Sequence, residues 1–398
     1  MNGREGVKKL VSKKFWLNDM EAVLGIVVVL IILGTINVFS SSFIISENNY
    51  GTPYFFLRRH LLNLGIAIFF GFIGWRVDYH RWRDFMPAVI FVTIASLVSV
   101  LLFGTAVNGS KRWLNLYITQ VQPAEWAKLV AILLASAYLS SAIKKGESIR
   151  LLPPQIWVIA LMAALVEAEP DMGTACFIAG IPILMFALSG LDRYKLYGLV
   201  ATGVVAVSGL CMLQPYRLER LKVMMDPWAD AQNIGYQVVQ SMSAIGSGGF
   251  WGMGLGMGIS KYDYLPEAHT DFAFAVLSQE NGFLGVMLVL LLFAALAFYA
   301  GRIANSAKDI FGQMLALGIM LLLVGQAAVN IFMVGGIGPV VGVPLPFISY
   351  GGTSLFVSIT CIGILSNIGE QGIRERKRGK RLPPPPEPAP PKLYLVKK

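Results

Sequence analysis

The chain of 398 residues is 55% hydrophobic and only 14% charged, with a mean hydropathy of +0.62. Soluble domains contain about a quarter charged residues, so this composition excludes an ordinary soluble enzyme and indicates a membrane protein. The net charge of +10 lies at the ends of the chain, with +3 in residues 1–20 and +7 in residues 372–398. Basic ends on a neutral body argue against nucleic-acid binding, which needs basic residues along a folded face.

A membrane-spanning helix is predicted wherever about 20 consecutive residues are mostly apolar and carry little charge. Ten such stretches lie near residues 21–43, 61–75, 85–104, 121–142, 154–170, 172–191, 194–213, 271–300, 309–334 and 353–370. The first stretch lacks a cleavage pattern, so we expect it to remain in the protein as a helix. The three cysteines lie apart in apolar runs, which predicts core residues rather than disulfides or a zinc site. The predicted fold class is an all-α integral membrane protein with ten transmembrane helices.

The loops between these helices differ in positive charge, which predicts the topology. The terminal side of the membrane collects 24 Lys and Arg residues and the other side 9. We therefore expect both termini in the cytoplasm and a large extracytoplasmic loop, residues 214–270, between the seventh and eighth helices. The chain then divides into a basic N-terminus (1–20), a membrane domain (21–371) and a basic, proline-rich tail (372–398).

The large outer loop has two notable parts. A basic amphipathic run at residues 216–224 is typical of a helix lying in the membrane interface, and a plain solvated loop is the alternative. Four alternating glycines, from Gly252 to Gly258, are similar to a phosphate-binding loop but lack its strand and helix. We expect them instead to let the backbone approach a helix or a substrate closely.

Ionisable residues at membrane helices are costly and mark candidate functional sites. Glu125 and Lys128 lie three positions apart on the fourth predicted helix, so they share a face and can pair. The alternative is a purely structural ion pair. Glu167, Glu169 and Asp171 crowd the outer end of the fifth helix and need a basic side chain or a divalent cation among them. A salt-bridge network is the favoured arrangement.

Asp271 opens the eighth predicted helix at the outer boundary, and the next eight residues carry no charge. A carboxylate half sheltered in this way has the raised pKa that a general base needs. The competing interpretation is that Asp271 is only the N-cap of its helix. The Gly/Pro-rich segment 344–354 joins the last two helices. Because such backbone is tolerated at membrane depth only where it is buried or lines a wet cavity, we expect it beside this site.

The sequence closely resembles the SEDS family of bacterial envelope proteins (FtsW, RodA and SpoVE) over residues 21–371. The resemblance rests on five motifs, at residues 109–113 (GSKRW), 122–125 (QPAE) with Lys128, 169–174 (EPDMGT), 264–272 (YLPEAHTDF) and 346–354 (PFISYGGTS). Glu169 before Pro-Asp and the Gly254-Leu255-Gly256 run look more like FtsW or SpoVE than RodA. The chain departs from the family pattern at residues 37–42 and at Trp126.

The resemblance implies a peptidoglycan glycosyltransferase that polymerises lipid II, the undecaprenyl-pyrophosphate disaccharide pentapeptide, outside the bacterial cytoplasmic membrane. It implies a class B penicillin-binding protein as partner, with other division or elongation proteins and no nucleic acid. The residue that matches the family's essential aspartate is Asp271. The process served is left open among septal division, elongation and sporulation.

The physical interpretation of Asp271 and the family resemblance together predict one mechanism. In this mechanism, Asp271 accepts the proton of the acceptor sugar's 4-hydroxyl. Undecaprenyl pyrophosphate is already a good leaving group, so positive charge matters more than a general acid. A divalent cation, Mg²⁺ or Mn²⁺, on the pyrophosphate is a further expectation, although no residue is assigned as a metal ligand. The residues expected to bind substrate are Lys111, Arg112, Glu125, Lys128, Glu169, Asp171, Arg217, Lys222, His269, Thr270, Ser349, Gly351 and Gly352.

Two other functions stay open at this point. A transporter of lipid II or another lipid-linked sugar agrees with the ten spans, the broken segment near 335–352 and the charges of the fourth helix. No inverted repeat is visible in its favour. A non-catalytic scaffold for a penicillin-binding protein would leave Asp271 as a helix cap.

Overall fold

The computed structural model describes residues 18–107, 110–115, 120–150, 152–212, 214–262 and 264–379. Predictions about most of the N-terminus, Gly109 and the proline-rich tail lie outside these residues. Each of the ten predicted spans coincides with a helix: α1 (Asp19–Tyr50), α2 (Phe55–Arg76), α4 (Met86–Phe103), α5 (Pro123–Lys145), α6 (Pro154–Ala168), α7 (Met172–Leu188), α8 (Arg193–Met212), α11 (Ala273–Asn305), α12 (Ile310–Val334) and α13 (Gly352–Gly379). Eight are long and apolar enough to cross a membrane, while α6 and α7 are apolar but shorter.

Local sequence signals set several helix ends. Asp171 caps α7 by accepting a hydrogen bond from the Thr174 amide at 3.2 Å, and Asp309 caps α12 through the Gly312 amide at 2.7 Å. Gly51 ends α1 with a φ of 65°, a conformation that favours glycine. The first turn of α5 begins with Pro123, whose missing N–H costs nothing there.

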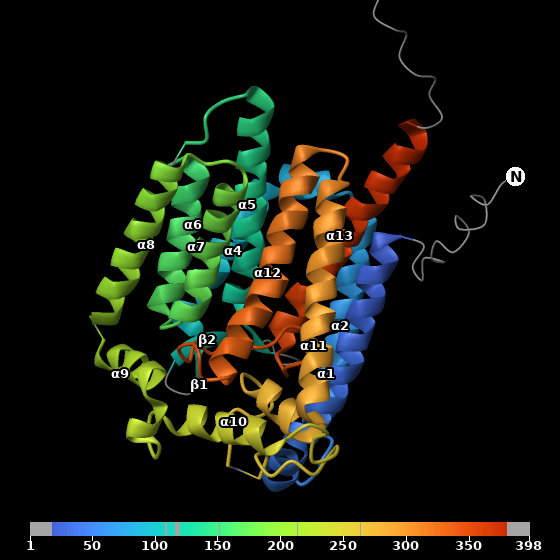
Figure 1. The fold of residues 1–398 in the computed structure, drawn as a ribbon. Helices are drawn as coiled ribbons and strands as arrows, with labels where there is room; N and C mark the ends of the chain where they lie inside the picture. The colour runs from blue at the N-terminus through green and yellow to red at the C-terminus, as the bar shows by residue number, and fades with distance from the viewer. Residues whose placement is uncertain are drawn as a thin grey trace, which may run out of the picture.

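The long helices stand side by side, with α5 and α13 inside the bundle and α8 at its edge (Figure 1). In the apolar 18-residue core of each helix, 89% of the residues of α13 and 72% of those of α5 are buried inside the protein, against 6% of those of α8. Two shorter helices, α9 (Pro215–Met225) and α10 (Tyr236–Ser247), lie across one end, joined by the 3-10 turn η1 (Pro227–Asp230). Residues 216–224 are therefore helical, as the amphipathic pattern predicts.

At the opposite end, the short helix α3 (Tyr79–Asp84) connects α2 to α4. The His80 ring lies between two carboxylates there, with Nδ1 2.7 Å from Asp78 and Nε2 against Asp309. These contacts join the α2–α3 connection to the start of α12. His80 is thus far from the end that carries α9 and α10 (Figure 1).

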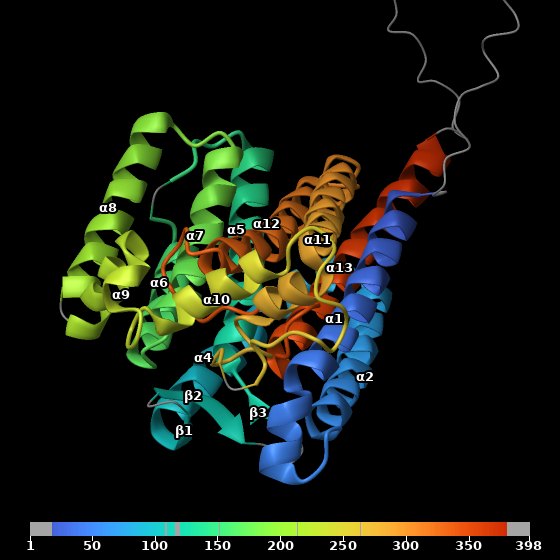
Figure 2. The ribbon, with the colours of Figure 1, turned by 60° about the horizontal axis from the view of Figure 1, so that its bottom comes forward.

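A small antiparallel sheet was not expected from the sequence. Its strands are β1 (Thr105–Val107), β2 (Ser110–Asn115) and β3 (Gln120–Val121), in the order β1-β2-β3. Ala106 pairs with Lys111 and Leu114 with Val121. Figure 2 shows the sheet at the same end of the bundle as α10. The strands are too short to be predicted from an alternation of polar and apolar residues. Arg112, in β2, contacts the corner between α6 and α7.

The glycine-rich part of the outer loop packs on α11 where that helix is interrupted. Gly282 has a φ of 62° and a ψ of −161°, which breaks the helical geometry. A Cβ on Gly252 would lie 2.2 Å from the Glu280 carbonyl, so only glycine fits at this approach. The amides of Met253 and Gly254 donate to the carbonyls of Gln279 and Glu280, both at 3.0 Å. The close backbone approach predicted for these glycines is confirmed.

Candidate active site

Asp271 lies in the turn before α11 and does not cap that helix. The N-cap position is Phe272, and no side chain caps the helix. The prediction that Asp271 opens the eighth helix, and the alternative that it is only an N-cap, are therefore wrong. The turn is closed instead by the amides of Thr270 and Phe272, which both donate to the Glu267 carbonyl at 3.2 Å.

A buried amide on α12 fixes the backbone at Asp271. Asn330 donates from Nδ2 to the main-chain oxygen of Asp271 at 2.8 Å and to that of Val343 at 2.7 Å. The Asp271 carboxylate itself accepts no hydrogen bond from the part of the chain that the structure describes. Gly342 lies directly beside it, since a Cβ there would be 3.4 Å from Oδ2.

The electrostatic surroundings of Asp271 favour its neutral form. Burial, followed by the carboxylates of Glu267 and Asp171, raises the pKa of this carboxyl to about 7, against the opposing effect of Arg112. A smaller contribution comes from Glu125. Asp271 is thus surrounded mainly by other acids, and at neutral pH it is present in both protonation states.

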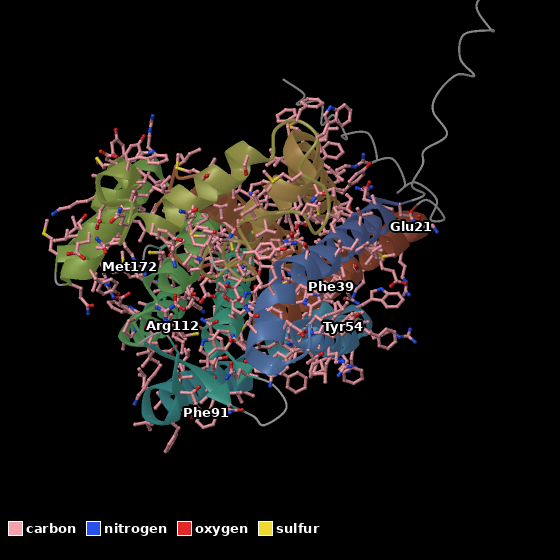
Figure 3. All side chains as sticks on the ribbon, turned by 90° about the horizontal axis from the view of Figure 1, so that it is seen from below. Glu21, Phe39, Tyr54, Phe91, Arg112 and Met172 are labelled. Atoms are coloured by element: carbon pink, nitrogen blue, oxygen red, sulfur yellow. The ribbon has the colours of Figure 1, made fainter. Side chains whose placement is uncertain are left out.

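Arg112 and the corner between α6 and α7 form one wall of this site. The guanidinium donates to the carbonyls of Pro170 and Glu169, and its Nη1 lies 4.0 Å from Asp171. Asp171 also accepts a hydrogen bond from Gln122 Nε2 at 3.0 Å. Figure 3 shows Arg112 beside the start of α7, which Met172 marks. The basic side chain expected among these carboxylates is therefore present.

Glu169 occupies an unusual position in this corner. Its side chain is fully buried, and both carboxylate oxygens lack a hydrogen-bond partner in the described residues. Burial and, to a smaller extent, the neighbouring Asp171 raise the pKa of the Glu169 carboxyl to about 8, against the opposing effect of Arg112. The third carboxylate, Glu167, pairs with the buried Arg217. In the described residues, no three His, Cys, Asp or Glu side chains are grouped to hold a metal ion.

The predicted pair of Glu125 and Lys128 is confirmed, and it extends into a network. Lys128 Nζ lies 2.7 Å from Glu125 Oε1 and 2.8 Å from Gln326 Oε1. Gln326 in turn donates to the Pro344 carbonyl at 2.9 Å and to the Ser354 hydroxyl at 3.3 Å. All of these groups are buried or nearly so, and they join α5 through α12 to the Gly/Pro-rich segment.

That segment, residues 344–354, lies beside the turn that carries Asp271, as predicted. The Tyr350 amide donates to the His269 carbonyl at 2.9 Å, and the His269 ring packs on the rings of Phe56 and Tyr350. Ser349 is buried, and its hydroxyl accepts a hydrogen bond from the Leu345 amide at 2.9 Å. Figure 3 shows the neighbouring ends of α1 and α2, where the rings of Phe39 and Tyr54 stack.

The other predicted substrate-binding residues have local roles or face solvent. Gly352 lies against Asn63, because a Cβ added to this glycine would be 2.7 Å from Asn63 Nδ2. The carbonyl of Gly351 accepts a hydrogen bond from the Leu355 amide at the first turn of α13. Thr270 donates from its hydroxyl to Glu267 Oε2 at 2.5 Å. Lys111 and Lys222 are exposed and form no ion pair among the described residues.

Two amides of this site, Gln326 and Asn330, were missed in the sequence, whereas Gln122 was noted only as part of the QPAE motif. The two missed amides lie four positions apart on α12, inside the stretch from Ile310 to Gly369 that contains no charge. Amides at this spacing share a helix face, and in an apolar span they rarely lack a partner. The spacing was therefore a usable signal for a buried polar contact.

Comparison with known proteins identifies the family. Residues 20–373 match the family model FtsW/RodA/SpoVE, described as cell cycle protein. The chain belongs to this family. One relative comes from Trichlorobacter lovleyi and is named probable peptidoglycan glycosyltransferase FtsW. It is 38% identical to this chain, over 90% of this chain and 96% of its own length. Stage V sporulation protein E from Bacillus subtilis is 36% identical over 86% of this chain and 94% of its own length.

Solved structures agree with this family assignment. One solved structure has a TM-score of 0.72 and 25% sequence identity, and the match covers 89% of this chain and 98% of that chain. Its title is "Structural coordination of polymerization and crosslinking by a peptidoglycan synthase complex". The rod shape determining protein RodA of Thermus thermophilus has a TM-score of 0.63 at 23% identity, over 89% of this chain and 98% of its own, and shares the fold. The resemblance stated from the sequence motifs is confirmed.

Proposed function

We propose that this chain is a peptidoglycan glycosyltransferase that polymerises lipid II into glycan strands. Its similarity to proteins named probable peptidoglycan glycosyltransferase FtsW supports the activity. The observation that carries the proposal is the state of Asp271, whose half-buried carboxylate has a pKa raised to about 7 and accepts no hydrogen bond from the described residues. Such a carboxylate is available and basic enough to take a proton near neutral pH.

The reaction exchanges one bond at the anomeric carbon for another. The 4-hydroxyl oxygen of the acceptor sugar bonds to the anomeric carbon of the donor chain, while the hydroxyl proton passes to Asp271. The bond from that carbon to the pyrophosphate oxygen breaks, and undecaprenyl pyrophosphate leaves with the electron pair. Arg112 lies within electrostatic reach of Asp271 and is a candidate to stabilise the leaving anion. A divalent cation on the pyrophosphate stays a prediction.

The reaction takes place, in this proposal, at the outer face of the bacterial cytoplasmic membrane, with both termini inside. The support is that β1–β3, α9 and α10 gather at the end of the bundle that carries Asp271 (Figures 1 and 2). These elements belong to the side of the membrane that collects 9 Lys and Arg residues, against 24 on the other side, and the side with fewer is generally extracytoplasmic. The sugars would react there while the lipid tail stays between helices.

We also propose a class B penicillin-binding protein as the partner. The solved structure with a TM-score of 0.72 supports it, because its title joins polymerization and crosslinking in a single synthase complex. Lipid II supplies both the sugars that are polymerised and the peptides that are cross-linked. A cross-linking enzyme held beside the polymerase would receive each strand as it forms.

The test is polymerisation of labelled lipid II by the purified complex, comparing wild type with Asp271→Asn at matched yield. The control is Asp226→Asn, because Asp226 lies in the same outer loop and caps η1, a role that asparagine also fills. Glycan strands from wild type and the control, with none from Asp271→Asn, support the proposal. Normal polymerisation by Asp271→Asn would refute the general-base role.

The transporter function has its own outcome in this experiment. If neither protein polymerises lipid II although the complex is intact, translocation of a labelled lipid-linked sugar into vesicles is measured next. Transport that survives Asp271→Asn would favour a carrier, and the absence of both activities would favour a scaffold.

A further inference from the structure

A cavity of about 400 Å³ opens between α9 and α10, close to Asp271 but separate from it. The two helices meet at the end of the bundle that carries the small sheet (Figures 1 and 2). The lining residues used below are Tyr216, Glu219, Arg220, Tyr236, Gln237, Pro266 and Val340. Small-molecule sites occupy roughly 300–1,000 Å³, so this volume suits a small part of a substrate.

The cavity shares a wall with the site of Asp271. Arg220 donates from Nη1 to the Val340 carbonyl at 2.9 Å, which ties α9 to the segment before α13. Two residues further on, Gly342 lies against Asp271 Oδ2. Pro266 lines the cavity from the other side and precedes Asp271 by five residues. The cavity and the site of Asp271 therefore lie on two sides of the same short segment, residues 340–342.

The lining matches a neutral, hydroxyl-rich ligand better than an anion. Glu219 and Arg220 contribute one charge of each sign, so the cavity offers no excess of cations for a pyrophosphate. The Gln237 amide has no hydrogen-bond partner among the described residues, and its side chain is half-buried. An amide in this state offers both a donor and an acceptor to a ligand.

Aromatic and apolar side chains complete the lining. Tyr216 holds its ring against the guanidinium groups of Arg217 and Arg220, at 5.6 and 5.7 Å from the ring centroid. Tyr236 begins α10, whose opposite face buries Val238 and Val239 in the protein. The cavity lining thus combines the aromatic side chains of Tyr216 and Tyr236 with the planar amide of Gln237. Sugar rings present the same combination, with apolar C–H faces and polar edges.

We propose that the α9–α10 cavity binds sugar units of the growing glycan strand behind the reacting unit. This inference rests on the proposed function, because it assigns a second subsite to the same reaction. A strand held there stays attached between additions, so the cavity sets how many units are added before release. It leaves the chemical step at Asp271 unchanged.

The first test compares Gln237→Ala with Gln232→Ala in lipid II polymerisation. Gln232 is exposed in the same loop and does not line the cavity. We expect Gln237→Ala to shorten the mean strand by about two- to tenfold, the loss typical of one hydrogen bond to a ligand, with the initial rate of lipid II consumption unchanged. Gln232→Ala should give wild-type strands. Strands of wild-type length from both Gln237→Ala and Tyr236→Ala would overturn the proposal.

A second test needs no turnover and therefore separates this proposal from the proposed function. A soluble, peptide-free peptidoglycan oligosaccharide is titrated into the purified complex and followed by saturation-transfer NMR. We expect binding to wild type and to Asp271→Asn, and weaker binding to Gln237→Ala. No binding to any of the three, or binding of a soluble stem peptide in its place, would refute a sugar subsite even if polymerisation depends on Asp271.

Discussion

Asn330 on α12 holds the backbone that carries Asp271, with its Nδ2 2.8 Å from the Asp271 carbonyl and 2.7 Å from that of Val343. One buried amide thereby joins the turn before α11 to the segment before α13. The carboxylate of Asp271 lies beside Gly342 in that segment, where an added Cβ would be 3.4 Å from Oδ2. Its position depends on α12 even though α12 contributes no charge to the site.

Replacing this amide is expected to reduce both stability and activity. Asn330→Ala leaves two buried carbonyls unpaired, each at a cost of about 1–3 kcal/mol. A displaced carboxylate slows the chemical step, and a shift of about 1 Å can cost roughly a hundredfold. Thermal unfolding and the rate of lipid II polymerisation measure the two effects. Asn281→Ala is the control, because it loses one bond within α11, to the Leu277 carbonyl at 3.0 Å. A wild-type rate in folded Asn330→Ala would contradict the positioning role.

The rate of polymerisation is expected to rise with pH through about 7, the value to which burial and neighbouring acids raise the pKa of Asp271. A general base acts only when deprotonated, so the rate falls at lower pH and levels off at higher pH. The measurement is kcat/KM for lipid II, which reports the pKa of the free enzyme, between pH 5.5 and 8.5, roughly the span over which such a group titrates. A flat profile for folded wild type would rule out Asp271 as the titrating base.

Glu169 leads to a different pH prediction, this time for stability. Burial raises the pKa of its carboxyl to about 8 in the folded protein, above the pKa in the unfolded chain. The contribution of this group to the free energy of unfolding is therefore fully present at a pH below the unfolded pKa. It is lost as the pH rises from the unfolded pKa through about 8. Glu169→Gln keeps the shape and stays neutral, so we expect unchanged activity at pH 7 and a higher melting temperature than wild type at pH 9. Equal pH dependence of melting in both proteins would show that Glu169 is charged when folded.

Features that depend on neighbouring residues could be predicted from the sequence. The spans follow from uncharged stretches of helical length, and the pairing of Glu125 with Lys128 follows from a spacing of three along one helix. A site at one end of the bundle could also be anticipated, because carboxylates and broken backbone collect in loops on one side. The motif around Asp271 then singled out one carboxylate among several.

Contacts between distant segments could not be predicted in the same way. Thr270 and Asp271 carry a cap signal, but the turn closes on the Glu267 carbonyl and delays the helix to Ala273. Ser40 and Glu280 meet across 240 positions, and no periodicity in either helix encodes that pairing. Such contacts depend on which faces of the bundle meet. The strands of the small sheet are likewise stabilised by their partners rather than by their own sequence.

Lys261 and Glu280 provide the last prediction, because they anchor the outer loop to α11. Lys261 Nζ lies 2.8 Å from Glu280 Oε1 and 3.1 Å from the Ser40 hydroxyl, with both charged side chains buried. Lys261→Met would leave the Glu280 carboxylate buried without its partner, which typically costs about 3–5 kcal/mol. Lys261→Met/Glu280→Gln removes both charges and keeps the contact to Ser40. We therefore expect the double variant to recover most of the melting temperature that the single variant loses.

A double-mutant cycle measures this coupling directly, with melting temperatures and unfolding free energies for wild type, both single variants and the double variant. The control is Lys145→Met, because Lys145 pairs with Glu147 at 3.9 Å on the exposed surface, where such pairs contribute little. Strict additivity of the two single changes would mean that the ion pair does not hold the loop. Coupling, together with normal polymerisation by the double variant, would assign the pair a purely structural task. The loop would then need a contact at this place, but no charge, to keep Asp271 in position.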